Sequence, residues 1–460
     1  MATPKSVDAD AAGTRFEPTS PHASTYDETS ELNQAGCSLR FMTLLSLPRM
    51  AIAMAWSAQT AVYGPLLQIL LSSTSVQLVQ MAGPISGVLL GPTVGVWSDT
   101  CTSRFGRRRP FLALGAGASI LCWVLLMYIM PIGRALGDTD IDRPWTSFLA
   151  VLCYVWIDIT LNVAQVPLNL ILADFAGDRQ VTAQVVGGLI TAVGYLIVAA
   201  YTYLFGAAYN SLQSFLGVLI GIMFVSSACV CLCVHEQRLP TSSTSVSTPS
   251  VLTAVLGAVY TGVRDLPPPL RIYFAIAFLT QYGYTAYNSS KGQFFGLVVN
   301  GGNAAGADTC DSTCSLAQDA YNRGVQLAGS ADALYIVGLA YLLFLPSLVR
   351  RFGVKRLVAY GCVPQVLLLL LAFCKETACT IMALAMPLVV HVLGPDADAG
   401  RFAGALNSAL CFGQLLNFAC ASVAVNTAWG YTLPIFLGGL CSVAAWLIAV
   451  VFFDVDMHSM

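Results

Sequence analysis

One apolar segment carries four polar side chains that could handle a proton and a polar ligand. Residues 156–169 read WIDITLNVAQVPLN, so Asp158, Asn162, Gln165 and Asn169 recur at spacings of four, three and four. In a helix these spacings place the four side chains on one face, whereas the other faces are aliphatic. A carboxyl group within a membrane is costly unless it faces water or partners, and it often marks a proton or substrate pathway. This pattern predicts that Asp158 carries a proton; a purely structural hydrogen-bond ladder between helices is the alternative.

A second polar face lies in the first apolar segment. Trp56, Gln59 and Tyr63 stand at i, i+3 and i+7, which is again one side of a helix. Amide and phenol groups hydrogen-bond hydroxyls, and aromatic rings cover the apolar side of a sugar ring. We expect Trp56, Gln59 and Tyr63, together with Asn162, Gln165 and Asn169, to bind the substrate. For Trp56 the alternative is the aromatic belt at the membrane surface.

The composition requires a membrane protein. The 460 residues are 56% hydrophobic and only 10% charged, whereas soluble domains carry about 25% charged residues. The net charge of −2 and short basic loops give no support to nucleic-acid binding. No constellation suggests an enzyme, a metal site or a bound cofactor. Most of the 15 cysteines lie in apolar runs, but Cys310 and Cys314 share a polar loop and could form a disulfide in an oxidising space.

Long apolar segments predict an all-α polytopic fold with twelve transmembrane helices in two halves. A polar tail at 1–39, read as disordered and cytoplasmic, precedes an N-terminal six-helix bundle at 40–234. A cytoplasmic linker at 235–269 leads to a C-terminal bundle at 270–453 and a tail at 454–460. The expected segments are 41–71, 76–97, 110–132, 147–173, 181–206, 211–234, 271–298, 324–349, 355–374, 377–394, 402–425 and 430–453.

The distribution of charge predicts the orientation of the chain in the membrane. Four arginines fall within positions 104–109, between the second and third segments, and such loops stay on the cytoplasmic side. With the N-terminus inside, only five of the 22 basic residues are expected in outer loops: Arg134, Arg143, Lys291, Arg323 and Lys375. Both termini are therefore expected in the cytoplasm.

The same loop resembles a known transporter motif. Gly95-x-x-x-Asp99 followed by Arg104-Phe-Gly-Arg-Arg-Arg109 looks like the loop between helices 2 and 3 of major facilitator transporters, and Arg351-Phe-Gly-Val-Lys-Arg356 echoes it in the second half. Parallel six-helix repeats are how that fold is built. The resemblance implies a gating latch made of Gly95, Asp99, Arg104, Gly106, Arg107 and Arg108, which could hold two halves together.

The longer string from Ser98 to Phe111 resembles one branch, the plant-type sucrose–proton symporters of the glycoside–cation symporter group. Asp158, Asn162, Gln165 and Pro167 match that family's fourth helix, and Tyr287 and Gln293 match its seventh, which adds both to the expected substrate site. Asn169 and Ser289 depart from it, because they stand where the family has an arginine and an aspartate. Asp332 could compensate as a second coupling acid, or it could sit at a helix end in water.

The resemblance covers most of residues 41–453 and implies uptake of sucrose or a related glycoside with protons by alternating access. The expected partners are the sugar, the proton and the lipid bilayer; the unit would be a monomer, in the plasma membrane rather than an organelle. A facilitative uniporter is the nearest alternative, motivated by Asn169 and Ser289. A non-transporting sugar sensor is the second, although the tails and linker are short for one.

Overall fold

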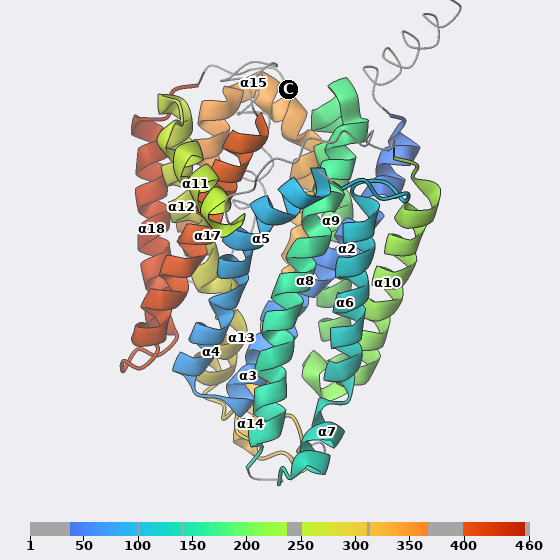
Figure 1. The fold of residues 1–460 in the computed structure, drawn as a ribbon. Helices are drawn as coiled ribbons and strands as arrows, with labels where there is room; N and C mark the ends of the chain where they lie inside the picture. Colours follow the sequence, from blue (N-terminus) through green and yellow to red (C-terminus); the bar gives the residue numbers. More distant parts are fainter. Residues whose placement is uncertain are drawn as a thin grey trace, which may run out of the picture.

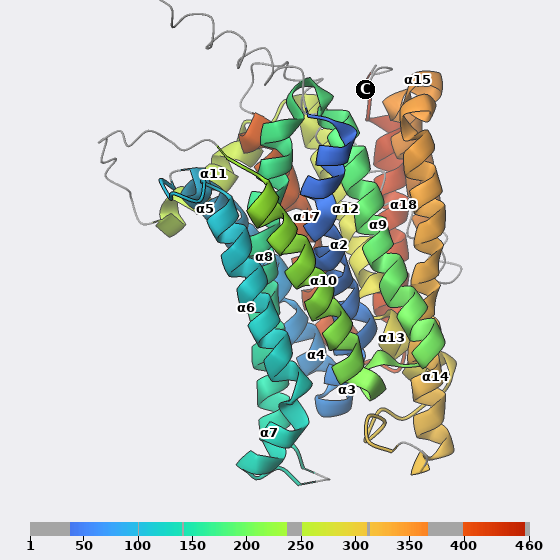
Figure 2. The ribbon, with the colours of Figure 1, turned by 90° about the vertical axis from the view of Figure 1, so that its right-hand side faces the viewer.

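A computed structural model describes residues 37–99, 101–139, 142–236, 251–310, 313–366 and 399–455. The described part of the chain is helical, and its long helices stand side by side as a bundle (Figures 1 and 2). The expected segment 377–394 lies outside the described residues, as do most of the N-terminal tail, residues 237–250 of the linker and residues 456–460.

The first half begins with a helix that changes its winding. α2 (Leu39–Ala58) passes into a π turn, η1 (Gln59–Tyr63), and then into α3 (Gly64–Leu70). Ser38 starts α2 by accepting a hydrogen bond from the Phe41 amide, which satisfies one free donor of the first turn. The other helices of this half are α4 (Ser73–Gln80), α5 (Ala82–Asp99), α6 (Arg109–Met127), α7 (Ile129–Leu136), α8 (Pro144–Ala176), α9 (Gln180–Phe205) and α10 (Leu212–Cys233), with short 3₁₀ turns η2 (Gly177–Arg179) and η3 (Ala208–Ser211).

The second half is more interrupted. The expected seventh segment is divided into α12 (Pro268–Asn288), α13 (Lys291–Gln293) and the π turn η4 (Phe294–Val299). The eighth and ninth run through α14 (Leu316–Ser330), η6 (Ala331–Leu334) and α15 (Tyr335–Val366), which breaks at Gly353 with φ of +75°. α17 (Ala399–Ala424) and α18 (Thr432–Val451) follow. α11 (Val251–Arg264) forms a helix inside the stretch expected to be linker.

Eight of the described helical stretches are long and apolar enough to cross a membrane. Their outer surfaces carry large exposed hydrophobic side chains such as Leu114, Phe148, Tyr203 and Phe224. In water such a surface would be unfavourable, but it suits contact with lipid tails.

The interior packs through small residues. A Cβ on Gly115 of α6 would lie 2.6 Å from the Ala164 backbone nitrogen in α8, and one on Gly283 of α12 would lie 2.7 Å from the Gly438 carbonyl oxygen in α18. Close approach of this kind lets membrane helices gain van der Waals contact. One buried cluster gathers mainly α2, α3, α6, α8 and α10, and another gathers α12, α15, α17 and α18.

The two halves of the chain are joined by hydrogen bonds at the end of the bundle that holds α3, α4, α13 and α14, the lower end in Figure 1. Thr74 pairs with Asn426, the Tyr431 hydroxyl donates to Gln68, and the Tyr321 hydroxyl donates to the Pro65 carbonyl. Arg143 makes a two-pronged ion pair with Asp308. At the opposite end these ion pairs between described residues each stay within one half: Asp99–Arg108, Arg107–Asp174, Arg108–Asp174 and Lys355–Asp454.

Candidate functional site

Asp158 lies in the middle of α8 with one carboxylate oxygen paired and one not. Its side chain is 1% exposed. Oδ1 accepts a hydrogen bond from Gln59 Nε2 at 2.6 Å, and within the described part of the chain Oδ2 has no partner. A Cβ on Gly83 of α5 would lie 3.3 Å from Oδ2, so a glycine leaves room for this oxygen. The carboxyl group is thus fixed by one oxygen and keeps the other available for a proton.

The helix changes its winding at Gln59, the residue that donates to Asp158. Pro65 has no amide hydrogen to continue the α-helical ladder, and the Gly64 amide instead bonds back five residues to the Gln59 carbonyl. Single π turns of this kind recur at functional sites.

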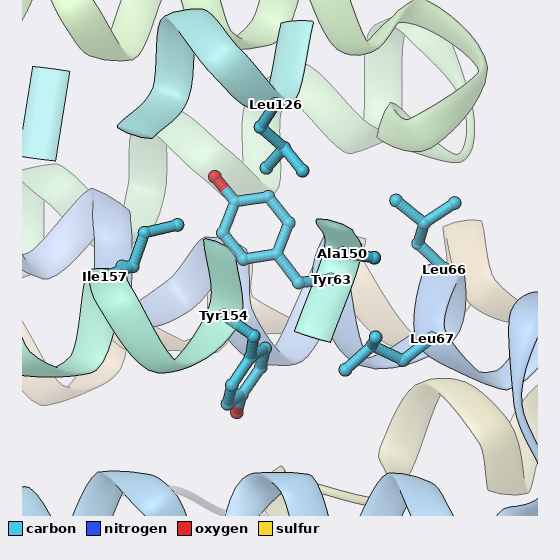
Figure 3. A pocket seen from close by; sticks show the side chains of 7 residues that line it. All are labelled: Tyr63, Leu66, Leu67, Leu126, Ala150, Tyr154 and Ile157. Carbon is cyan, nitrogen blue, oxygen red and sulfur yellow. The ribbon is translucent and has the colours of Figure 1, made fainter. Parts of the chain in front are cut away.

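Tyr63, the third residue predicted with Trp56 and Gln59, has apolar surroundings in this structure. Tyr63 is the last residue of the π turn. Its ring lies in the core of the first half beside Leu126, Tyr154 and Ile157 (Figure 3). The cavity there measures about 10 Å³, which is at the lower limit for one water molecule and far too small for a sugar.

Two further members of the predicted face link α8 to its neighbours. Trp56 Nε1 donates to Gln165 Oε1 at 2.9 Å, which joins the polar faces of α2 and α8. Asn162 Nδ2 donates to the Asp158 carbonyl at 2.8 Å and to Ser86 Oγ of α5 at 3.0 Å. The structure therefore brings Trp56, Gln59, Asp158, Asn162 and Gln165 into one connected region, in which all five are at least partly buried.

Asn169 meets a residue that sequence reasoning missed. Arg49 Nη2 of α2 donates to Asn169 Oδ1 at 2.8 Å, and the same guanidinium reaches Gln184 Oε1 at 3.4 Å. Its Nε is buried without a partner among the described residues. A Cβ on Gly187 would lie 2.1 Å from Nη1, so a larger residue there would displace the guanidinium. The signal in the sequence was a single arginine inside an apolar segment.

Asp332 is buried rather than placed in water at a helix end. Its side chain is 1% exposed and forms an ion pair with Lys291, which is itself fully buried. Ser57 of α2 donates to the second oxygen at 3.2 Å, and Lys291 also donates to Asn288. The expectation that Lys291 lies in an outer loop is therefore wrong: the broken seventh helix carries it inward, where Asp332 compensates its charge.

Tyr287 and Gln293, the other two expected substrate residues, lie on either side of the Lys291 break. Tyr287 is buried in an apolar cluster with Phe294, Tyr431 and Ile435. Gln293 is fully buried, and neither of its amide atoms has a hydrogen-bond partner in the described part of the chain.

The expected gating motif forms its ion pairs inside the first half. Arg108, which is almost fully buried, pairs with Asp99 at 2.5 Å, and both Arg107 and Arg108 contact Asp174 of α8. Gly106 has a φ of +102°, and a Cβ there would lie 2.4 Å from a carboxylate oxygen of Glu236. Gly95 has open space where a Cβ would be, and Arg104 lies over the ring of Phe105. In this conformation these contacts tie α5, α6 and α8 together rather than joining the two halves.

No group of His, Cys, Asp and Glu side chains suited to a metal ion occurs among the residues that the structure describes. Cys310 and Cys314 form a disulfide in the loop between η4 and α14, which was one of the two possibilities open for this pair.

Known proteins with similar sequences are sugar transporters. The chain is 29% identical to sucrose transport protein SUC3 of Arabidopsis thaliana over 190 residues, which is 39% of this chain and 32% of that protein. It is 39% identical to the proton-associated sugar transporter A of Mus musculus over 127 residues, 27% of this chain and 17% of that protein. The matching segments thus span a third or less of these relatives, and no protein-family model matches the chain.

Solved structures decide the fold. A D-xylose–proton symporter superposes with a TM-score of 0.57 at 14% identity, covering 90% of this chain and 97% of that one. The major facilitator superfamily transporter FucP, in its outward conformation, gives 0.51 at 13% identity over 89% and 98%. The chain has the major facilitator fold. The expected all-α fold class is thereby confirmed, as are the resemblance to sucrose transport proteins and the multi-pass membrane character.

Proposed function

We propose that this protein moves sucrose or a related glycoside across a membrane together with protons, by alternating access of two helical bundles. The observation that carries the proposal is Asp158: a buried carboxyl group in a membrane helix, held through Oδ1 by Gln59 and free at Oδ2. Relatives named as sucrose and proton-associated sugar transporters support the substrate class.

The proton belongs on Oδ2 of Asp158. Gln59 Nε2 can only donate, so Oδ1 accepts from it whether or not the carboxyl is protonated. The side chain can therefore gain and lose its proton without losing its anchor. When protonated, the neutral group no longer carries an uncompensated charge in a buried site, and the halves can rock around it.

Asp332 takes a different part in the proposed cycle. Because Lys291 compensates its charge, Asp332 has no need of a proton in this conformation. Ser57 of α2, in the other half, donates a hydrogen bond to Asp332. A movement between the halves would therefore break or alter this contact. We assign Asp332 as a coupling acid that becomes available when Lys291 moves away.

The division of the chain follows from the same proposal. A cytoplasmic tail at 1–39, bundles at 40–234 and 270–453, a cytoplasmic linker at 235–269 and a short tail at 454–460 place the Arg104–Arg109 loop inside the cell. The end closed by Arg143–Asp308 then faces outward, and the Cys310–Cys314 disulfide fits that oxidising side. We expect a monomer in the plasma membrane.

Uptake of radiolabelled sucrose in transport-deficient cells tests the proposal. Proton symport predicts uptake that rises at acidic external pH and collapses with an uncoupler. Uptake that depends on neither the external pH nor the uncoupler would favour the uniporter. The specific argument for a uniporter is that Asn169 and Ser289 stand where the resemblance implies charged residues. No uptake of sucrose or other glycosides, with the protein at the cell surface, would contradict sugar transport.

A further inference from the structure

Three buried glutamines meet where the two halves are joined. Gln77 and Gln80 lie on α4, and Gln293 lies on α13; their exposed fractions are 0%, 2% and 0%. In the described part of the chain, both amide atoms of Gln293 and Oε1 of Gln80 lack hydrogen-bond partners, whereas Gln77 lies within reach of the Tyr431 hydroxyl. Gln77 and Gln80 were not among the residues predicted to bind substrate.

Gly64 shows how close together two of the glutamines are. The amide nitrogens of Gln80 and of Gln293 each lie 3.3 Å from the position that a Cβ on Gly64 would occupy. Gln77 stands one turn before Gln80 on the same face of α4. The first half of the chain thus supplies the amides of Gln77 and Gln80, and the second half supplies that of Gln293. Two of these amides, those of Gln80 and Gln293, lie beside Gly64, which has no side chain.

Unpaired amides at this depth call for a partner. At least nine in ten buried polar groups in proteins are hydrogen-bonded, and each one left unpaired costs about 1–3 kcal/mol. An amide group offers two donors and an acceptor oxygen, which complement hydroxyl groups that both donate and accept. A polyhydroxylated ligand would satisfy several of these atoms at once.

The glutamines also lie next to the proposed proton carrier. Gly83, which faces the unpartnered Oδ2 of Asp158, follows Gln80 by three residues, where α4 gives way to α5. The turn of α5 that follows the glutamines of α4 therefore faces the unpaired carboxyl oxygen of Asp158 on α8. A ligand on the glutamines would have its edge beside the carboxyl group.

We propose that Gln77, Gln80 and Gln293 form a hydroxyl-binding subsite for the transported glycoside, shared by both halves and adjacent to Asp158. The proposal rests on the function proposed above and names the residues that would link sugar binding to protonation. Because the subsite needs amides from α4 and from α13, sugar binding would favour the conformation in which the two halves are closed around it.

Replacing single glutamines with methionine tests the subsite, because methionine keeps the length of the side chain but cannot form these hydrogen bonds. We expect Gln80→Met and Gln293→Met each to raise the KM for sucrose about tenfold, the effect of losing one or two hydrogen bonds, and to remove most of the sucrose-dependent rise in melting temperature. Without sucrose, the melting temperature of the purified full chain should stay the same or rise, since unpaired amides are removed.

Gln365→Met is the matched control. Gln365 is also a buried glutamine, but it accepts from Ser442 between α15 and α18 of the second half, and its replacement should leave the KM unchanged. Methionine variants of Gln80 and Gln293 that keep the wild-type KM and sucrose-dependent stabilisation would overturn the subsite. If the wild-type protein itself neither transports nor is stabilised by sucrose or other glycosides, the proposed function fails instead.

Discussion

Arg49 of α2 holds Asn169 of α8 through a hydrogen bond of 2.8 Å. The resemblance to the sucrose symporters leads us to expect arginine at position 169; here a guanidinium reaches Asn169 from a different helix. Within the described residues its partners are neutral amides, so its charge is not compensated by a carboxylate.

Exchanging these two residues tests whether the position of the charge matters. Arg49→Asn should lower kcat/KM for sugar uptake by about 10- to 100-fold, because a buried charged hydrogen bond contributes about 1.5–3 kcal/mol. Adding Asn169→Arg should restore much of the loss, since the guanidinium then lies within a side chain's length of its original place. Arg40→Asn, an exposed arginine of the same helix, is the control. A double variant no better than Arg49→Asn would show that the charge acts elsewhere.

We expect the ion pair between Arg143 and Asp308 to keep closed the end of the bundle that is proposed to face outward. Its two bonds measure 2.8 and 3.2 Å, and the side chains are 13% and 4% exposed. Breaking a buried pair costs about 3–5 kcal/mol, so Arg143→Asp should favour the outward-open state. We expect a cysteine introduced at Thr74, in a background without free cysteines, to react several-fold faster with an impermeant maleimide.

Charge reversal supplies the control for that experiment. The double variant Arg143→Asp with Asp308→Arg rebuilds the pair in the opposite direction, and labelling at position 74 should return toward the starting rate. Labelling that stays fast in the double variant would mean that the pair does not hold this end closed.

Variants of the buried ion pair between Lys291 and Asp332 should have different effects on stability and on transport. Lys291→Met removes the charge that compensates the buried Asp332 carboxylate. The melting temperature should fall markedly, because removing one partner of a buried ion pair costs about 3–5 kcal/mol. Removing both charges, with Lys291→Met and Asp332→Leu, should restore stability but not proton-driven uptake. Full uptake by the stable double variant would exclude a coupling role for Asp332.

Asp138 should make the start of α8 sensitive to acid. Its carboxylate accepts hydrogen bonds from the Trp145 and Thr146 amides at 2.9 and 2.7 Å, beyond the end of α7. Desolvation raises the pKa of Asp138, but the hydrogen bonds from Thr146 and Trp145 lower it by more, so the net shift is downward. Folding therefore gains stability from this group above the pKa of the unfolded carboxyl, and the gain is lost as the pH falls through the lower folded value.

The melting temperature of Asp138→Ala should accordingly fall at neutral pH, and the difference from wild type should shrink below about pH 4. Asp142→Ala, an exposed acid of the same loop, should have little effect. An unchanged difference at both pH values would rule out the capping charge as the cause.

Helical periodicity made part of the site predictable. α8 is one continuous helix, so the spacing of Asp158, Asn162 and Gln165 translated directly into a shared face. The change of winding at Gln59–Tyr63 could not be predicted, because a residue count cannot reveal a π turn. The composition and segment lengths sufficed for the fold class, since lipid contact imposes long apolar runs.

The burial of charged side chains could not be predicted from the sequence. Lys291 looked like a loop residue because lysine is rare in membrane spans, and only the fold shows that Asp332 lies beside it. Arg49 and the glutamines of α4 were missed for a similar reason: the role proposed for each depends on a residue of another helix that lies beside it. Partners more than 100 positions away, as for Arg49 with Asn169, leave no local pattern.

The most direct test of the central claim uses Asp158→Asn in proteoliposomes, with Asp142→Asn as the control acid. Two quantities would be measured: sucrose accumulation driven by an imposed pH gradient, and exchange of labelled for unlabelled sucrose without a gradient. If Asp158 carries the proton, the variant loses accumulation and keeps exchange, because asparagine mimics the protonated acid but cannot release a proton. Accumulation that persists in Asp158→Asn would contradict the account.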